Sequence, residues 1–593
     1  MKTLRIIVRP QASALSIGGH TPALHGGDHA TARDAAGRPT IPASALRGAF
    51  RLELERLLRG RDPDKAACSA NRDEGGAECS CPVCRLFGQP GTAAGSLRLE
   101  DAVLPDDAPA AATDLRPRVA ISRGRRAAVE ELLAFIETTP PLAPTTELRA
   151  DAWLVGTDDK QLEEDLNNLR AACAAMRALG GSKARGMGWV ECEVTVAAPS
   201  APEPPIIEAD GGLRLTFKAL APLHFGLGPP LGYFQPSRRH ATGSAVRGAV
   251  AFALLDHGIC DDGDSPAFQQ LLNAGFGSAR VAGDRPSVTR RRCRGAGHVI
   301  DDLVPEILRR RGAEEGIALA INPDRACPVP GCDAVKMVPA DYADGVRKPR
   351  VRVRTRTAIN RRTGTSMDAK LFSHEVLEHP VTLIAEIWGL DASAAALVAQ
   401  LHGRDVWLGG KRSQGMGLCR VSVEPAKKAD REKTLKQIDD LKRALTDGWD
   451  ALRQADARLG SLLEDDEEPV AVVLAEPWLP SPEPTPETLE AGPLAGADAR
   501  PLGAFLRLAE EGRFAALEAA RHGAPDTFDT GEVPPCSVVD AGSVYVYAVP
   551  RPTLEERLDQ WLEQGRLGSG ERASEGWGRF LIRGLSDPGA DEP

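Results

Sequence analysis

The chain has 593 residues, which is too many for a single hydrophobic core and predicts about three to four domains. Its formal net charge of −10 argues against nucleic acid as a partner, but charge is distributed unevenly along the chain, and local patches decide binding. No apolar run reaches the ~18 residues of a membrane span and no signal peptide is recognised, so we expect a soluble, cytoplasmic protein.

Residues 1–198 predict a mixed unit of strands and helices. Residues 4–8 alternate apolar and polar side chains, as a half-buried strand does. Further on, Leu46, Phe50 and Leu54 recur at helical spacing, and the arginines between them fall on another face. The unit ends with GGSKARGMGW, a glycine-rich basic loop directly before a β-type run.

Residues 199–212 are rich in proline and predict a linker, after which the same landmarks return in the same order. LRIIVRP in the first unit corresponds to LRLTFKA in the second, PASALRGA to TGSAVRGA, RVAISR to RTAINR, and GGSKARGMGW to GGKRSQGMGL. Glu137 and Glu375 stand equally far from the RVAISR and RTAINR motifs. This order indicates an internal repeat, so we expect a second unit over residues 211–425.

The rest of the chain differs from the two units. Residues 426–468 are highly charged and predict an amphipathic helix or hairpin, which we interpret as a spacer. Residues 469–593 contain a strand, a helix and the glycine-rich stretch EGWGRF, and predict a half-module. The expected fold class is α+β, with tandem modules of ferredoxin-like or RRM-like size.

Basic residues in and near the repeated loops indicate a polyanionic ligand. Glycine permits positive φ and close backbone approach, so loop amides can face phosphates. Every second residue from 350 to 356 is arginine, which projects four like charges from one face of a strand. A tight turn and a solvated basic edge strand are the alternatives. The candidate RNA contacts are Arg47, Arg51, Arg118, Arg123, Gly180, Gly181, Lys183, Arg185, Arg247, Arg350, Arg352, Arg354, Arg356, Arg361, Gly409, Gly410, Lys411 and Arg412.

Two groups of cysteine and histidine suit a metal ion. The first group lies in a loop with too few apolar residues to fold alone, and a tetrahedral Zn²⁺ ion would cross-link this loop. The alternative is that these cysteines are reduced thiols on the surface. In the second group, four residues separate the ligands of each pair, as C-x4-H and C-x4-C. This spacing is looser than the C-x2-C of common zinc sites, so zinc and its absence are equally supported there. The candidate ligands are Cys68, Cys79, Cys81 and Cys84, and then Cys293, His298, Cys327 and Cys332. The remaining cysteines are interpreted as core or incidental.

The ordered set of LSIGG, IPASALRGAFR, a Cys cluster with LFG, AISR and GGSKARGMGWV resembles the RAMP superfamily of CRISPR–Cas effector complexes. The first unit is similar to the backbone subunit of type III complexes. The second unit with the tail is similar to the capping subunit of type III-D systems. The resemblance implies a fused antiviral subunit that binds crRNA and target RNA. It also implies further backbone RAMP subunits, a large polymerase-like subunit and a small helical subunit as partners. The alternative to a spacer for the 426–468 segment is a piece that resembles this small subunit.

The resemblance also implies a catalytic residue. In nuclease-competent backbone subunits an aspartate lies in the loop before the IPGSSLRG-like motif, and a second aspartate stands six residues after the first. Asp28 and Asp34 have that spacing, so the catalytic match falls on Asp28, and Asp34 is expected to cap a turn. A carboxylate beside a scissile phosphate can hold Mg²⁺, and His25 and His29 can assist proton transfer. The resemblance thus implies a metal-dependent endoribonuclease. The alternatives are a non-catalytic RNA-binding scaffold and an enzyme that processes the guide precursor. Residues 213–248 of the second unit contain no Asp or Glu, so that unit is expected to bind without cutting.

Overall fold

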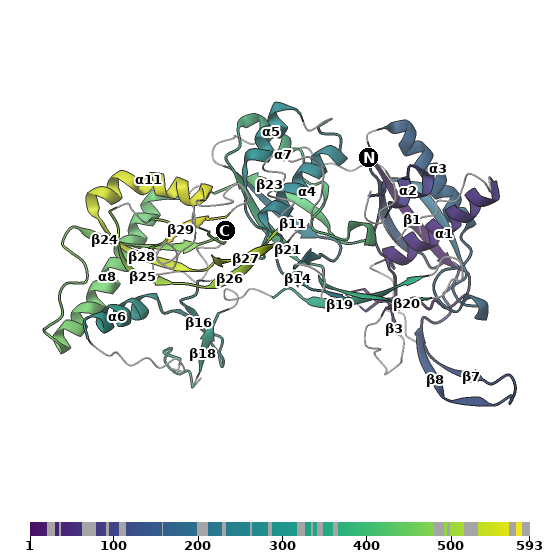
Figure 1. Ribbon diagram of the computed structural model, residues 1–593, viewed down its shortest axis with the longest axis horizontal. Helices are drawn as coiled ribbons and strands as arrows, with labels where there is room; N and C mark the ends of the chain where they lie inside the picture. Colours follow the sequence, from purple (N-terminus) through teal and green to yellow (C-terminus); the bar gives the residue numbers. More distant parts are fainter. Residues whose placement is uncertain are drawn as a thin grey trace.

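The computed structural model describes residues 1–19, 30–34, 37–61, 79–89, 94–105, 114–156, 158–197, 212–227, 233–260, 264–282, 287–316, 327–333, 336–340, 348–359, 366–427, 429–479, 491–494, 498–514, 532–568 and 577–583. Three modules follow one another along its long axis, with the N-terminal module at one end and the C-terminal module at the other (Figure 1). Each module is a sheet covered by helices, which confirms the α+β class. Among the described helices, none combines the length and apolar character that crossing a membrane requires.

The first module is built on an antiparallel sheet of order β10-β1-β9-β6-β4, in which β5 also pairs with β9. Its elements are β1 (Lys2–Pro10), β2 (Gly18–Gly19), β3 (Ala30–Thr31), β4 (Thr40–Ile41), α1 (Ala43–Arg61), α2 (Pro82–Phe87), β5 (Leu97–Leu99), β6 (Ala102–Val103), β7 (Asp114–Ile121), β8 (Ala128–Thr138), β9 (Leu148–Leu154), α3 (Asp159–Ala175), η1 (Lys183–Arg185) and β10 (Val190–Val196). Leu4, Ile6 and Val8 of β1 are fully buried with Phe50 of α1, as the two predicted periodicities require.

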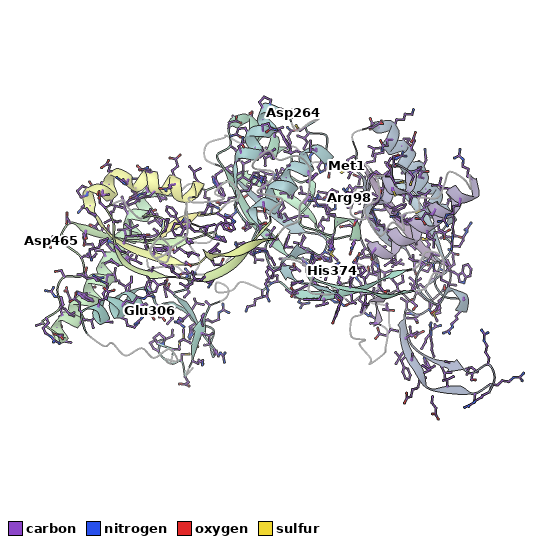
Figure 2. The ribbon with its side chains drawn as sticks, viewed as in Figure 1. Met1, Arg98, Asp264, Glu306, His374 and Asp465 are labelled. Carbon is purple, nitrogen blue, oxygen red and sulfur yellow. The ribbon has the colours of Figure 1, made fainter. Side chains whose placement is uncertain are left out.

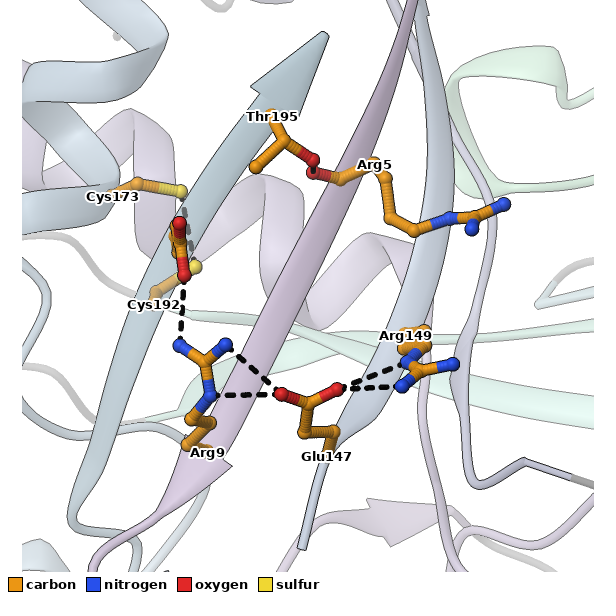
Figure 3. A network of polar contacts seen from close by, with 8 residues as sticks. Arg5, Arg9, Glu147, Arg149, Cys173, Cys192 and Thr195 are labelled. Carbon is orange, nitrogen blue, oxygen red and sulfur yellow. Dashed lines mark hydrogen bonds and ion pairs between the residues drawn. The ribbon is translucent and has the colours of Figure 1, made fainter. Parts of the chain in front are cut away.

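Polar contacts join the strands of this sheet, and a thiol pair joins it to a helix (Figure 3). Arg9 on β1 pairs with Glu147, next to β9, and with Glu193 on β10, at 2.9 and 2.8 Å. The Sγ atoms of Cys173 on α3 and Cys192 on β10 lie 3.0 Å apart. These two cysteines, which the sequence showed as unrelated, therefore lie side by side where α3 packs on the sheet.

The second module repeats this plan with a sheet of order β15-β21-β11-β23-β22. Its elements are β11 (Leu213–Ala219), β12 (Phe225–Gly226), β13 (Phe234–Gln235), β14 (Ser237–Arg238), α4 (Gly243–Asp256), α5 (Pro266–Asn273), β15 (Gly275–Phe276), β16 (Arg290–Cys293), β17 (Val299–Asp301), α6 (Leu303–Glu314), β18 (Met337–Pro339), β19 (Val351–Ile359), β20 (Ser366–Leu377), β21 (Thr382–Trp388), α7 (Ala392–Ala399), β22 (Asp405–Trp407), η2 (Arg412–Gln414) and β23 (Leu418–Pro425). The Glu137 carboxylate accepts from the Thr31 amide, and Glu375 accepts from the Ser237 amide, so the sequence repeat is also a structural repeat.

The C-terminal module has an antiparallel sheet of order β25-β28-β24-β29. Its elements are α8 (Arg431–Ala455), β24 (Glu467–Leu474), β25 (Arg500–Phe505), β26 (Leu508–Phe514), β27 (Glu532–Val539), β28 (Val544–Pro550), α11 (Arg551–Leu567) and β29 (Phe580–Arg583). Helix α8 differs from the expected spacer, because Ile438, Leu441 and Leu445 are buried in the core of this module. The predicted amphipathic helix is present, and its apolar face packs into the module while most of its charged residues are exposed or half-buried.

Candidate nucleic-acid interface and metal centres

The two glycine-rich loops, glycine loop 1 (180–189) and glycine loop 2 (409–418), have one backbone conformation. Ser182 and Lys411 occupy the left-handed region at φ 60° and 59°, each before a short 3-10 turn. Gly186 and Gly415 end these turns at φ 80° and 77°. Left-handed backbone at each end of the turn favours glycine and explains part of the motif.

Close packing within each module explains other glycines of these loops. A Cβ on Gly180 would lie 2.6 Å from the Ser16 carbonyl oxygen, and the Gly181 amide donates to that same oxygen at 2.7 Å. Glycine loop 2 repeats both contacts on His224, through Gly409 and Gly410. The amides of Gly181 and Gly410 are therefore engaged by the protein, contrary to the expectation that the loop amides face phosphates. The basic side chains of the loops remain the candidate ligand contacts.

The two loops differ in what surrounds them. Lys183 and Arg185 of glycine loop 1 are exposed. Lys411 and Arg412 are half-buried, and burial lowers the pKa of both, as it also lowers the pKa of Lys183. Lys411 and Arg412 are partly covered because glycine loop 2 packs against the first module. A Cβ added to Gly415 would lie 2.4 Å from the Cβ of Ala43 in that module. Glycine loop 2 thus forms part of the contact between modules, whereas a Cβ added at Gly186, the equivalent position of glycine loop 1, would meet nothing within 4 Å.

The junction of the first and second modules combines apolar and charged contacts. Trp153 and Trp407 meet edge to face with ring centroids 5.2 Å apart. Arg354 pairs with Asp101 at 3.1 Å across the junction. Arg98 lies at the same boundary (Figure 2), where burial lowers the pKa of its guanidinium. These contacts fix the orientation of the two modules.

The arginine strand is β19, and the structure gives most of its charges a protein partner. Arg352 pairs with Glu378 at 3.3 Å, and Arg354 pairs with Asp101. Arg356 donates to the Gln414 side-chain oxygen at 2.9 Å, and burial lowers its pKa to about 10. Arg352 and Arg354 therefore have acidic partners within the protein, whereas the partner of Arg356 is an uncharged amide. Arg350 is exposed, and Arg361 lies outside the described residues.

Two further arginines have structural partners inside the first module. Arg47 donates to the carbonyl oxygens of Leu97 and Phe87 at 2.9 and 2.5 Å, and burial lowers its pKa to about 10. Arg51 is buried and pairs with Glu55 at 3.1 Å. Arg51 also donates to the Gly88 carbonyl at 3.0 Å, so both arginines fasten α1 to the segment around α2. Arg247 is half-buried on α4.

The hairpin β7–β8 projects from the rest of the first module (Figure 1), and the first six residues of β8 are exposed. Arg118 reaches from β7 to the Ser182 hydroxyl, which joins the hairpin to glycine loop 1. Arg123 is exposed at the turn, beside Arg125 and Arg126, which the sequence analysis missed although RGRR marks a basic turn. Exposed apolar side chains accompany them, namely Leu115, Val119, Ile121, Val129, Leu132 and Leu133. We name Arg118, Arg123, Lys183 and Arg185 the basic face.

The candidate catalytic residues Asp28, His25 and His29 lie outside the described residues, but the ends of their loop are described. Gly18–Gly19 pairs with Ala30–Thr31 and brings these ends together. The Glu137 backbone and side chain hold Thr31 at 2.9 and 3.2 Å. The loop therefore emerges from a fixed base.

Asp34 belongs to a turn. Its Oδ1 accepts from the Arg38 amide at 2.8 Å, and its Oδ2 pairs with the Arg38 guanidinium at 2.8 Å. The side chain is only 8% exposed. This geometry is the turn-capping role that a short carboxylate before a glycine favours.

The first metal cluster brings Cys79, Cys81 and Cys84 within 4.8 Å of one another, while Cys68 lies outside the described residues. The Cys81 thiol caps α2 by accepting from the Cys84 amide at 3.4 Å. Three of the four predicted ligands are thus assembled at a helix start. Such a group could hold a metal ion such as zinc.

The second metal cluster is assembled from all four predicted ligands, Cys293, His298, Cys327 and Cys332. The Cys293 and Cys332 sulfurs are 3.6 Å apart, and the Cys327 sulfur is 3.5 Å from Nδ1 of His298. Ligands at ~2.3 Å from a tetrahedral zinc are about 3.8 Å from one another, so these distances fit.

The charge state of Cys293 also fits a metal ligand. Burial raises the pKa of this thiol, but hydrogen bonds from the backbone amides of Ala296 and Gly295 outweigh burial and bring the pKa to about 7. A lowered pKa favours the thiolate, which is the form that binds zinc.

Comparison with known families addresses the first module. Residues 19–191 match the model of the RAMP superfamily. No curated protein matches the chain. The match supports a RAMP protein, and this family implies CRISPR-associated RNA binding. The matched span ends at Glu191 and contains glycine loop 1, the hairpin β7–β8 and the first metal cluster.

Proposed function

We propose that the chain is a subunit of a type III CRISPR effector complex. Ferredoxin-like RAMP modules bind crRNA along the basic face, and the second and C-terminal modules cap the 5′ tag. The observation that carries the proposal is the exposure of Arg123, Lys183 and Arg185 of the basic face, inside the span that matches the RAMP family. Its four cations lie on two joined elements, where they suit successive phosphates.

The first module also cleaves the paired target RNA in this proposal, with Asp28 as the catalytic carboxylate. The resemblance and the closed base of the loop support this role. Mg²⁺ held at Asp28 would stabilise the negative charge that develops on the phosphate. The neighbouring imidazoles of His25 and His29 would move protons.

Further RAMP subunits would dock on the hairpin β7–β8 and glycine loop 1. The equivalent elements of the second module, β19–β20 and glycine loop 2, already contact the first module. Replacing Leu132 and Leu133 by aspartate should release such a neighbour without loss of folding, because both side chains are more than half exposed. A complex of unchanged mass by native mass spectrometry would reject this docking surface.

Zinc is the metal that both clusters fit in this proposal. The softness of the thiolates and the tetrahedral spacing of the second cluster support it. Zinc here would have a structural role, since each cluster lies in a segment with few apolar residues.

The decisive experiment is to purify the chain with its genomic neighbours and to sequence the bound nucleic acid. Short RNAs with a constant 5′ tag would support the effector assignment, and their absence would reject it. Incubation with complementary RNA and with guide precursor then separates the alternatives. Cleavage of the target alone supports the nuclease, cleavage of the precursor alone supports a processing enzyme, and cleavage of neither supports a scaffold.

A further inference from the structure

The second metal cluster lies in an insertion of the second module, residues 287–340, which we name the zinc insertion. It joins β15 to β19, whereas the first metal cluster lies between α1 and β5. The two clusters therefore occupy different connections of the repeated fold. The second cluster is not a copy of the first, and it needs an explanation of its own.

Polar contacts attach the zinc insertion to the C-terminal module. The Val288 amide donates to the Gly542 carbonyl at 2.8 Å. Arg583, the last residue of β29, pairs with Asp301 at the end of β17. The Arg583 side chain is 5% exposed, so water screens this ion pair little.

Apolar contacts make the attachment larger. Leu303 and Ile307 of α6 are fully buried in one cluster with Leu441 and Leu445 of α8. Arg310 of the same helix donates to the Ala504 carbonyl at 2.6 Å and lies over the Phe505 ring, 4.5 Å from its centroid. Helix α6 therefore belongs to the second module in sequence and to the C-terminal module in packing.

The metal ligands and helix α6 are connected through a small sheet. Cys293 ends β16, which pairs with β17 and β18. Asp301 of β17 accepts from the Leu303 amide at 3.1 Å and so fixes the first turn of α6. The apolar cluster around the ligands is small, with Met337, Ile300 and Val329 as its members besides the cysteines. This contact area is too small to hold three short strands without the metal.

We infer that zinc at the second metal cluster is an interlock that keeps the zinc insertion, together with helix α6, docked on the C-terminal module. The inference rests on the proposed zinc occupancy and is independent of the RNA-binding proposal. Removing the metal should loosen the sheet β16–β17–β18, then the start of α6, and finally the contact of α6 with α8. The first module should remain unaffected.

The test uses the full chain and compares two double variants, Cys327→Ser/Cys332→Ser and the control Cys79→Ser/Cys81→Ser. Each should lose about one equivalent of zinc in elemental analysis. Hydrogen exchange should accelerate roughly tenfold in α6 and α8 in the first variant only, because local opening exposes their amides. Loss of zinc with unchanged exchange in α6 and α8 would overturn the inference, and so would zinc retention in the first variant.

A reversible measurement covers the case in which the first variant fails to fold. The wild-type chain is treated with a zinc chelator and then given Zn²⁺ alone. Exchange in α6 and α8 should rise with the chelator and return with the metal. Unchanged protection in the metal-free chain would reject the interlock. RNA binding by the same samples reports on the proposed function separately, so the two failures are distinguishable.

Discussion

Arg47 and Lys183 show that basic residues predicted to bind RNA can have different roles, one structural and one at the surface. Both carry a positive charge near the RAMP motifs, yet Arg47 donates to two buried carbonyls and Lys183 is exposed. Helical spacing correctly put Arg47 off the main apolar stripe. It could not show that the segment around α2 covers that face, because α2 is distant in sequence.

Replacing Lys183 and Arg185 by alanine should weaken guide-RNA binding without loss of folding, because both side chains are exposed. Each phosphate contact removed should lower the slope of log K against log salt by about 0.7 for single-stranded RNA. The matched control is Arg47→Ala, which should destabilise the fold by about 1–3 kcal/mol by leaving carbonyls unpaired. Binding titrations at several salt concentrations measure the slope. An unchanged slope in the folded double variant would contradict the assignment of the basic face.

Asp28→Ala should abolish target cleavage while guide binding persists, since losing a metal-holding carboxylate removes several kcal/mol of transition-state stabilisation. Asp34→Ala is the control in the same loop region. It should retain cleavage and lower stability by about 1 kcal/mol, because Asp34 caps a turn and pairs with Arg38. Cleavage assays with Mg²⁺ measure the first effect and thermal unfolding the second. Full activity of Asp28→Ala would transfer support to the scaffold alternative.

Glu100 gives the fold a pH dependence at the junction of the first and second modules. Burial raises the pKa of its carboxyl well above the usual value, and the charges of Asp151, Asp101 and Asp405 raise it further. A carboxyl with a raised folded-state pKa contributes stability below its unfolded pKa and loses it as pH rises through the folded pKa.

Glu100→Gln should therefore unfold at a higher temperature than the parent at about pH 8, because the amide remains neutral. The difference should shrink as the pH falls toward about 4.3, the ordinary pKa of glutamate. Calorimetric scans across this range check the prediction. A constant difference at all pH values would mean that packing, and not the charge of Glu100, controls the junction.

At the scale of elements, the sequence predicted regular structure where the pattern is local. The alternation in β1 and the apolar spacing in α1 appear in the structure as one shared core. The repeat predicted that β19–β20 would correspond to β7–β8. What the sequence could not predict was the surroundings. Whether an arginine of β19 meets a phosphate or Asp101 depends on how two modules dock, which no local periodicity encodes.

The same limit applies to α8 and to the metal clusters. The charge of residues 426–468 suggested a spacer, whereas Leu441 and Leu445 pack against α6. The ligands of the second metal cluster could be named from spacing, although 39 residues separate Cys293 from Cys332. The spacing of cysteine and histidine in the sequence predicted the four ligands of the second metal cluster. Only the fold showed that this cluster lies next to the C-terminal module.

For the whole molecule, two structurally equivalent glycines isolate the contact between modules. Gly186 and Gly415 have nearly equal φ, but a Cβ on Gly186 meets nothing within 4 Å, and one on Gly415 overlaps Ala43. Alanine at either position should cost about 1 kcal/mol of backbone strain. Gly415→Ala should also separate the first two modules, seen as faster hydrogen exchange in β5. Equal behaviour of the two variants would show that glycine loop 2 does not hold the junction.

Stacking of modules recurs at the other junction. Arg579, from the glycine-rich stretch of the C-terminal module, pairs with Glu386 at 2.7 Å and lies over the Trp388 ring. These residues belong to β21, which corresponds to β9 of the first module. The chain is thus a short head-to-tail series, in which each glycine-rich stretch after the first rests on the preceding module.

Covalent connection changes how strong the contact at Gly415 must be. The linker of residues 199–212 holds the first two modules at an effective concentration on the order of millimolar. A contact with a dissociation constant of tens of micromolar would therefore be almost fully closed within one chain, although the separated modules would drift apart at cellular concentrations. The docked loop can consequently be small, and selection is free to shape the surrounding surface for its ligand. Joining the modules in one polypeptide also fixes their order and their one-to-one ratio.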